Sequence, residues 1–230
     1  MPVAGYPVLE QVMRIYASHG LREFVLALGH MKEDIVRYAK SRRALYSIDC
    51  VDTGPTTDTG GRVRNCLDHL GHRFHCTYVD GLGDVDVSAL AAFHSARGGA
   101  ATLTAAPLRS QYGIVKYDDR DRITEFVEKP VLSDYWINAG FFVFDRDAIA
   151  NTPGENLERD VLPSLAERGL LNVFRHSGFW RSMDTYKDQQ DLDALWLPYA
   201  EDLEGRIQGI RAAVPAWLAG RQALANVENG

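Results

Sequence analysis

One stretch decides the expected fold, and it reads Tyr78-Val79-Asp80-Gly81-Leu82-Gly83-Asp84-Val85-Asp86. With residues 73–77 before it, the stretch is typical of a short, mostly apolar strand that ends at an acidic residue beside a glycine. A helix start follows, because Asp84 or Asp86 can cap the apolar residues that recur at helical spacing in 87–94. The pattern predicts one rim of an open α/β sheet, where ligands bind outside the carboxyl ends of the strands.

Asp80 is the first candidate binding residue. Its carboxylate suits a hard cation that also contacts phosphate oxygens, and Gly81 lets the backbone come close to a ligand. The alternative is that Asp80 only begins a turn and Gly81 closes it. The stretch alone leaves both interpretations open, so the rest of the chain has to decide between them.

The segments around this stretch alternate between helical and strand patterns. An amphipathic helix is predicted at 7–19, stopped by Gly20, and a continuous apolar strand at 23–29 of the kind buried on both faces of a parallel sheet. Further predicted elements are helices at 31–40, 63–70, 156–167 and 186–197, strands at 47–52, 100–106, 136–144 and 171–176, and a hairpin across 113–130. This order predicts a doubly wound, mostly parallel, Rossmann-like α/β sheet.

Composition excludes several classes of function. The 25 basic and 31 acidic residues give a formal charge of −6, and without a basic block nucleic-acid binding is not expected. No apolar run is long enough to cross a membrane, and no membrane partner is expected. Three cysteines without CxxC spacing indicate reduced thiols in a cytoplasmic protein rather than a disulfide framework or a zinc site.

The length predicts one main domain with a C-terminal appendage. We place the main domain at 1–197 and a helical extension at 198–230. Ile210 and Trp217 in the extension could line a subunit contact of a homo-oligomer. The simpler expectation is a helix packed on the main domain.

A loop rich in glycine and threonine is predicted at 53–62, leading into the next helix. Gly60 and Gly61 would let the main chain approach a flat ligand such as a nucleobase, and Thr59 precedes them. A plain surface loop is the alternative. Taken alone, the loop favours that simpler interpretation.

Polar residues at other strand ends could complete a site. Asp80 and Asp184 could share one Mg²⁺, an ion that takes a few carboxylates together with phosphate oxygens and water. Lys129 could neutralise a phosphate, Glu128 could accept sugar hydroxyl protons, and Asn138 offers a donor and an acceptor to a polyol. Each residue alone is better explained as a solvated charge or a turn residue, but their joint occurrence after successive strands favours a site.

Taken together, these segments resemble the sugar-1-phosphate nucleotidyltransferase family, and within it the glucose-1-phosphate cytidylyltransferases. They occur in the family's order from the start of the chain to about Trp196. The segments are Thr59-Gly60-Gly61-Arg62-Val63, the stretch 78–86, Ala101-Thr102-Leu103-Thr104, Glu128-Lys129-Pro130, Trp136-Ile137-Asn138-Ala139-Gly140-Phe141-Phe142 and Gly178-Phe179-Trp180-Arg181-Ser182-Met183-Asp184-Thr185.

The resemblance implies a role for each candidate residue. Positions equivalent to Asp80 and Asp184 bind Mg²⁺ in such enzymes, and that of Lys129 holds the sugar phosphate, which makes Asp80 and Lys129 the expected catalytic residues. Contacts to the sugar come from Glu128, Asn138 and the backbone of Gly113, and the base faces Thr59, Gly60 and Gly61. The implied reaction is an in-line displacement at the α-phosphorus of a nucleoside triphosphate by a sugar 1-phosphate, with release of pyrophosphate.

The sequence departs from the family pattern at its start. The family begins with a strand, a glycine-rich loop with an arginine, and a Pro-Lys-Pro-Met segment, whose methionine coincides with Met1 here. The absent strand would be a central one beside the strand that ends at Asp80, so its neighbours would expose unpaired backbone. Asp80 is also preceded by Val79, where the most similar family members have glycine.

Three explanations of this departure remain. A start assigned too far downstream is preferred, because Met1 falls on a methionine of the motif. Otherwise the chain is a natural short homologue that binds or isomerises a nucleotide sugar without nucleotidyl transfer, or it derives from a decayed gene. The expected substrates are CTP and glucose 1-phosphate by resemblance alone, since the sequence itself fixes neither the base nor the sugar.

Overall fold

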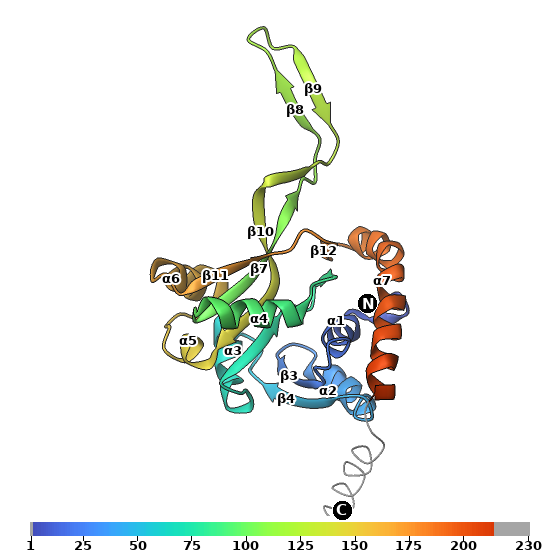
Figure 1. Ribbon diagram of the computed structural model, residues 1–230, viewed down its shortest axis with the longest axis vertical. Helices are drawn as coiled ribbons and strands as arrows, with labels where there is room; N and C mark the ends of the chain where they lie inside the picture. The colour runs from blue at the N-terminus through green and yellow to red at the C-terminus, as the bar shows by residue number, and fades with distance from the viewer. Residues whose placement is uncertain (1, 214–230) are drawn as a thin grey trace, which may run out of the picture.

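The computed structural model describes residues 2–213 and has a mixed sheet at its centre (Figure 1). Four strands lie in the order β11, β7, β10, β5, with bounds Leu171–Arg175, Ala101–Arg109, Val131–Asp145 and Arg73–Thr77. β7 and β11 are parallel, whereas β10 runs antiparallel to both of its neighbours. The α/β fold is confirmed, and the sheet is mixed because the hairpin after β7 sends the chain straight back as β10.

A second strand pair lies beside this sheet without joining it. β3 (Glu23–Leu28) and β4 (Ser47–Asp52) pair in parallel. Among the described residues, β3 pairs only with β4, and β5 pairs only with β10. A cavity of about 1200 Å³ is lined by every residue of β3 and of β5. The structure therefore has an open position beside the strand that leads to Asp80, as the sequence predicted.

The open position changes the burial of β3. The sequence predicted a strand buried on both faces, but only Leu28 of this strand is buried. Phe24, Val25 and Leu26 are half-buried and line the cavity. The prediction was wrong in burial because no second neighbouring strand covers the edge of β3 in the described structure.

Helices cover both sides of the strands. Their bounds are Val8–Ala17 for α1, Lys32–Ser41 for α2, Thr59–Asn65 for α3, Val87–Arg97 for α4, Arg146–Ala150 for α5 and Leu162–Glu167 for α6. The Asp86 carboxylate accepts a hydrogen bond from the backbone N–H of Ala89, which confirms it as the cap of α4. α3 begins four residues earlier than expected because Asp58 caps it, and it is followed by a short 3₁₀ turn at Leu67–His69.

β10 separates two apolar cores. Phe141 and Val143 pack on one side with residues of α1, α4 and α7, whereas Phe142 and Phe144 pack on the other side with residues of α5 and α6. The alternation follows from the two-residue period of a strand. Segment Leu157–Val161 is a π-helical turn that leads into α6, within the helical region expected at 156–167.

The final helix, α7, runs from Tyr186 to Ala213 with Pro198 inside it. Leu203 and Trp196 belong to the same core, so the expected boundary between residues 197 and 198 falls within one helix that packs on the main domain. Trp217, the other candidate for a subunit contact, lies outside the described residues. No helix among the described residues is long and apolar enough to cross a membrane.

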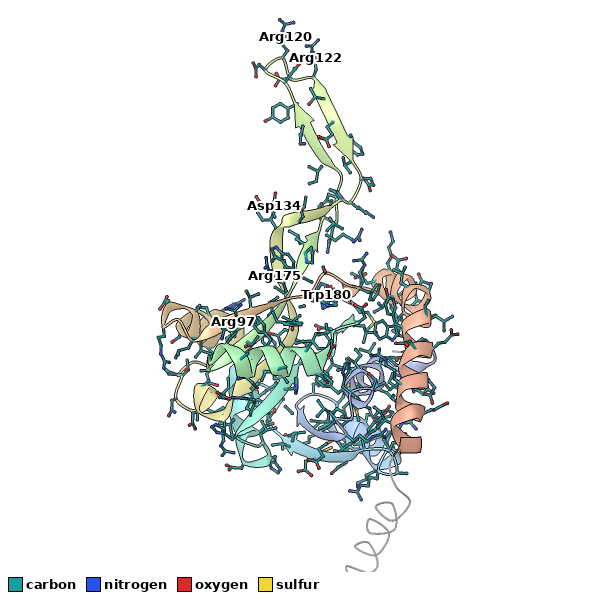
Figure 2. The ribbon with its side chains drawn as sticks, viewed as in Figure 1. Arg97, Arg120, Arg122, Asp134, Arg175 and Trp180 are labelled. Carbon is teal, nitrogen blue, oxygen red and sulfur yellow. The ribbon has the colours of Figure 1, made fainter. Side chains whose placement is uncertain are left out.

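An arm extends from the main body (Figure 1). It consists of the distal ends of β7 and β10 and of the hairpin formed by β8 (Ile114–Tyr117) and β9 (Ile123–Val127). Every residue of β8 and β9 is exposed. Figure 2 shows Arg120 and Arg122 at the tip of the arm and Asp134 near its base. Four short strands form two further pairs outside the arm. β1 (Pro2–Val3) pairs with β2 (Tyr6–Pro7), and β6 (Gly81–Gly83) pairs with β12 (Trp180–Ser182).

Candidate active site

A short antiparallel pair brings the two predicted metal-binding aspartates together. Gly81 of β6 pairs with Ser182 of β12, and just beyond this pair the backbone N–H of Met183 donates to the carbonyl of Asp80 at 2.7 Å. Asp184 is the next residue after Met183. Residues more than one hundred positions apart in the sequence are thus held at one edge of the fold.

The charge of Asp184 reaches the carboxylate of Asp80. Burial raises the pKa of Asp80 above its usual value, and the nearby negative charge of Asp184 raises it further. The Asp184 carboxylate accepts a hydrogen bond from the Ser182 hydroxyl at 3.0 Å, which fixes its orientation. A bound cation would offset the unfavourable effect of the Asp184 charge on the Asp80 carboxylate.

The donor set fits Mg²⁺. Both side chains offer hard oxygen ligands, and Mg²⁺ sites in proteins use one or two carboxylates with phosphate oxygens and water. Within the described chain, no group of three or more histidine, cysteine, aspartate or glutamate side chains forms a metal site, so the pair would hold Mg²⁺ only together with phosphate oxygens and water. When bound, the ion would neutralise charge on that phosphate.

Trp180 connects this edge to the central sheet. Its indole N–H donates to the carbonyl of Ala139 in β10 at 2.8 Å, which ties β12 to the central sheet. Figure 2 shows Trp180 near the junction between the body and the arm. A Cβ atom on Gly81 would lie 3.5 Å from the Trp180 indole nitrogen, an ordinary van der Waals contact, so β6 packs against the indole ring here.

Two arginines lie between the carboxylates and the arm. The sequence alone assigned no role to either of them. Burial lowers the pKa of Arg181 and the positive charge of Arg109 lowers it further, which places the two guanidinium groups near each other. Arg181 is in β12, three residues before Asp184, and Arg109 ends β7 at the base of the arm. Two guanidinium groups close together favour the binding of an anion such as a phosphate. Of the two arginines, only Arg181 belongs to a segment that carries the family resemblance, residues 178–185.

Of the predicted sugar and sugar-phosphate residues, all but Asn138 lie on the arm. A Cβ atom on Gly113 would lie 2.9 Å from the Glu128 carboxylate, so these two residues are neighbours across the hairpin. Lys129 has a φ of +47°, a left-handed conformation that costs energy for a residue other than glycine. No hydrogen bond or ion pair between residues 2 and 213 joins this group to Asp80 or Asp184. The structure therefore brings Gly113, Glu128 and Lys129 together but keeps them apart from the carboxylates.

Thr59, Gly60 and Gly61 lie in the first turn of α3 rather than in a loop. Gly60 and Gly61 are buried, and a Cβ on Gly60 would meet the backbone of Glu155 and Leu157 at 3.0–3.2 Å. The Gly61 N–H donates to the carbonyl of Glu155. In this structure the glycines allow close packing of α3 on segment 155–157. Their contact with a base stays a prediction.

A hydrogen-bonded chain connects Thr59 to Asn138. The Thr59 hydroxyl donates to the Glu158 carboxylate at 2.7 Å, and the Tyr78 hydroxyl donates to the same carboxylate. The Asn138 amide lies 3.5 Å from the Tyr78 oxygen, and its carbonyl oxygen accepts from the Gly140 N–H at 2.9 Å. Sequence analysis missed Glu158, because nothing in its local pattern separates it from a solvated helix residue.

The open position between β3 and β5 ends at this site. Tyr78, Val79 and Asp80 line the cavity together with both strand edges, and Thr59 and Arg62 of α3 line it as well. The volume of about 1200 Å³ is at the upper end of small-molecule pockets. Asp80 of the carboxylate pair, Thr59 of α3 and the cavity therefore form one continuous region.

Comparisons with known proteins agree with this arrangement. Residues 1–188 match the model of the NTP_transferase family, described as nucleotidyl transferase. Glucose-1-phosphate cytidylyltransferase from Salmonella typhi is 31% identical over 220 residues, which cover 84% of this chain and 85% of the relative. A probable glucose-1-phosphate cytidylyltransferase from Bacillus subtilis is 33% identical with the same coverage.

Solved structures give the same fold. HddC from Yersinia pseudotuberculosis, complexed with GMP-PN, superposes with a TM-score of 0.65 at 16% identity, covering 85% of this chain and 88% of that chain. A glucose-1-phosphate thymidylyltransferase structure from Bacillus anthracis, described as putative, gives 0.62 at 17% identity and covers 86% of this chain and 85% of that chain. On the match over residues 1–188 and the curated relatives, the chain belongs to the sugar-1-phosphate nucleotidyltransferase family.

Proposed function

We propose that this chain transfers a nucleotidyl group from a nucleoside triphosphate to a sugar 1-phosphate, forming a nucleotide sugar and pyrophosphate. The observation that carries the proposal is the adjacency of Asp80 and Asp184 at the edge of the sheet, where Met183 donates to the Asp80 carbonyl. CTP and glucose 1-phosphate are the proposed substrates, because the relatives at 31–33% identity are named as glucose-1-phosphate cytidylyltransferases.

The residues of this chain would position and neutralise rather than form a covalent intermediate. Asp80 and Asp184 would hold Mg²⁺, which supplies positive charge to the reacting phosphates. Arg181, three residues before Asp184, would add positive charge to the reacting phosphates together with the nearby Arg109. Lys129 would hold the sugar phosphate, with Glu128, Gly113 and Asn138 on the sugar and Thr59, Gly60 and Gly61 toward the base.

For Lys129 to hold the sugar phosphate near the two carboxylates, the arm would have to approach the body. Lys129 and Glu128 follow β9 directly, and the carbonyl of Pro130 accepts a hydrogen bond from the Ser110 N–H at the start of the arm. Arg109, one residue before Ser110, is close enough to Arg181 to lower its pKa. The base of the arm therefore already lies beside β12, and a bend beyond Ser110 would bring Lys129 toward the carboxylates.

The open position between β3 and β5 favours a second function. If this position stays open and has no phosphate-binding loop beside it, the protein would bind or isomerise a nucleotide sugar without activating a triphosphate. The two functions share the carboxylate pair but differ in whether pyrophosphate is released.

A pyrophosphate-release assay separates them. It crosses the four nucleoside triphosphates with several sugar 1-phosphates, on this chain and on a chain extended by the residues encoded upstream of Met1. Nucleotidyl transfer predicts release with one pair, strongest for CTP with glucose 1-phosphate, and lost in Asp80→Ala. Nucleotide-sugar binding without release from any pair, in both chains, would support the second function instead.

A further inference from the structure

Glu158 has the contacts of a residue that connects two parts of the proposed site. One of its carboxylate oxygens accepts from Thr59 at 2.7 Å and the other accepts from the Tyr78 hydroxyl. Thr59 begins the helix turn proposed to face the base, and Tyr78 lies within 3.5 Å of the amide of Asn138, which is proposed to face the sugar. The carboxylate is thus the only described side chain that hydrogen-bonds both Thr59 and Tyr78.

The side chain of Glu158 is not needed to hold its own segment in place. Asn156 donates from its amide to both carboxylate oxygens of Asp58 at 3.1 Å. The carbonyl of Glu155 accepts from the Gly61 N–H, and the Leu157 N–H donates to the Thr59 hydroxyl at 2.8 Å. These bonds fix segment 155–158 to α3 independently of the Glu158 carboxylate, so the bond from Glu158 to Tyr78 serves another purpose.

The ring of Tyr78 packs against β10, and within the described chain its hydroxyl is held only by hydrogen bonds to side chains. Its ring contacts Phe142 edge to face at a centroid distance of 5.5 Å. A Cβ atom on Gly140 would lie 2.5 Å from the Tyr78 ring, and Gly140 has a φ of +76°, so both the close approach and the backbone conformation require glycine there. A packed ring whose hydroxyl contacts both Glu158 and Asn138 can transmit a small shift of one of these side chains to the other.

We propose that Glu158 and Tyr78 are positioning residues that couple the base half of the site to the sugar half. Binding of a nucleoside at α3 fixes Thr59 and Glu158, which orients Tyr78 and through it the Asn138 amide toward a sugar 1-phosphate. The two ligands then bind more tightly together than separately. This inference rests on the proposed function, because it uses the assignment of Thr59 to the base and of Asn138 to the sugar.

The test is a calorimetric measurement of glucose 1-phosphate binding with and without saturating cytidine, in the presence of Mg²⁺. Cytidine carries no phosphate and leaves room for that of the sugar. In the wild-type protein, cytidine is expected to tighten glucose 1-phosphate binding at least fivefold, the lower end of ordinary coupling between sites. In Tyr78→Phe and Glu158→Gln the coupling falls below about twofold, while each ligand alone binds within about threefold of wild type.

Matched variants separate coupling from a loss of packing. Tyr78→Phe keeps the ring that contacts Phe142 and removes only the hydroxyl. Thr59→Ser keeps the hydroxyl and should keep the coupling, whereas Thr59→Val has a similar shape and should lose it. Glu167→Gln, on the exposed side of α6, and Tyr117→Phe, on the arm, should leave the coupling at its wild-type value.

The outcomes distinguish this inference from the proposed function. If the wild type binds both ligands and Tyr78→Phe and Glu158→Gln keep the full coupling, the positioning role is wrong and the proposed function stands. The same holds if the wild type binds both ligands without coupling. If the wild type binds neither ligand, the proposed function and this inference fail together.

Discussion

The two strand groups of this molecule share an α/β design but differ in how completely they are buried. In the four-stranded sheet, residues 139–144 of β10 are buried on both sides by the two cores. In the β3–β4 pair, most residues are exposed or half-buried, and the edge of β3 faces the cavity of about 1200 Å³. The difference teaches that strand sequence alone does not bury a strand: a continuous apolar pattern needs a neighbour on each edge.

The largest expected effect compares two phenylalanines of these groups. Phe144 in β10 is 0% exposed, whereas Phe24 in β3 is half-buried against Tyr46. Phe144→Ala should lower the free energy of unfolding by about 3–5 kcal/mol, and Phe24→Ala by only about 1–2 kcal/mol. Urea unfolding of both variants measures this. Equal losses would show that β3 is as well packed as the central sheet.

The next effect concerns His75, which lies on the edge of β5 and lines the cavity. Burial, and then the charges of His19 and His94, lower the pKa of His75 to about 4. A histidine whose pKa is lowered by folding stabilises the protein above its unfolded pKa near 6.5, and this contribution is lost as pH falls toward 4. The free energy of unfolding should fall by up to about 1.4 kcal/mol per pH unit between these values.

A variant tests whether His75 is responsible. His75→Gln should flatten the pH dependence between 6.5 and 4, and His72→Gln, at an exposed position before β5, should not. Denaturant unfolding at several pH values measures the slope. An unchanged slope in His75→Gln would mean that water reaches this edge of β5 freely and that its environment resembles that of β3.

The smallest effect concerns Asp80 at the end of the cavity. Because folding raises the pKa of Asp80, its contribution to stability is present at low pH and is lost as pH rises through the folded-state pKa. Asp80→Asn should therefore raise the melting temperature at pH 7 without Mg²⁺. The corresponding gain in the free energy of unfolding should be less than about 1 kcal/mol, because the side chain is partly exposed. The gain should vanish at acidic pH.

Asp134→Asn, at the exposed base of the arm, is the matched control and should not change the melting temperature. Thermal unfolding followed by circular dichroism at pH 7 and at acidic pH measures both variants. A lower melting temperature for Asp80→Asn at pH 7 would show that the carboxylate stabilises the fold, contrary to the electrostatics of the pair.

Local patterns were enough to predict most elements of the fold. The helix that Asp86 caps, the hairpin across 113–130 and the strand at 47–52 all follow from residues close together in sequence. The antiparallel direction of β10 could not be predicted in this way, because it depends on the arm returning directly to the sheet. The poor burial of β3 could not be read from its apolar sequence either, since it depends on a neighbour that is not among the described strands.

The site was predictable only in part, because several of its contacts join segments that are far apart in the sequence. The resemblance to a family predicted that Asp80 and Asp184 meet, and the pairing of β6 with β12 explains how, because Asp80 directly precedes β6 and Asp184 follows β12 by two residues. Gly60 and Gly61 read as a loop but form a helix turn packed on segment 155–157. The contacts of Glu158 and of Arg109 join distant segments, so no local pattern could reveal them.

The most direct test of the account is the Mg²⁺ dependence of CDP-glucose binding, measured by calorimetry with Mg²⁺ and with EDTA. A Mg²⁺ site shared by Asp80 and Asp184 predicts that the wild type binds CDP-glucose at least about tenfold more tightly with Mg²⁺ than with EDTA. Asp80→Ala and Asp184→Ala should each bind weakly and equally in both buffers. Mg²⁺-dependent binding that survives in either variant at the wild-type strength would contradict the account.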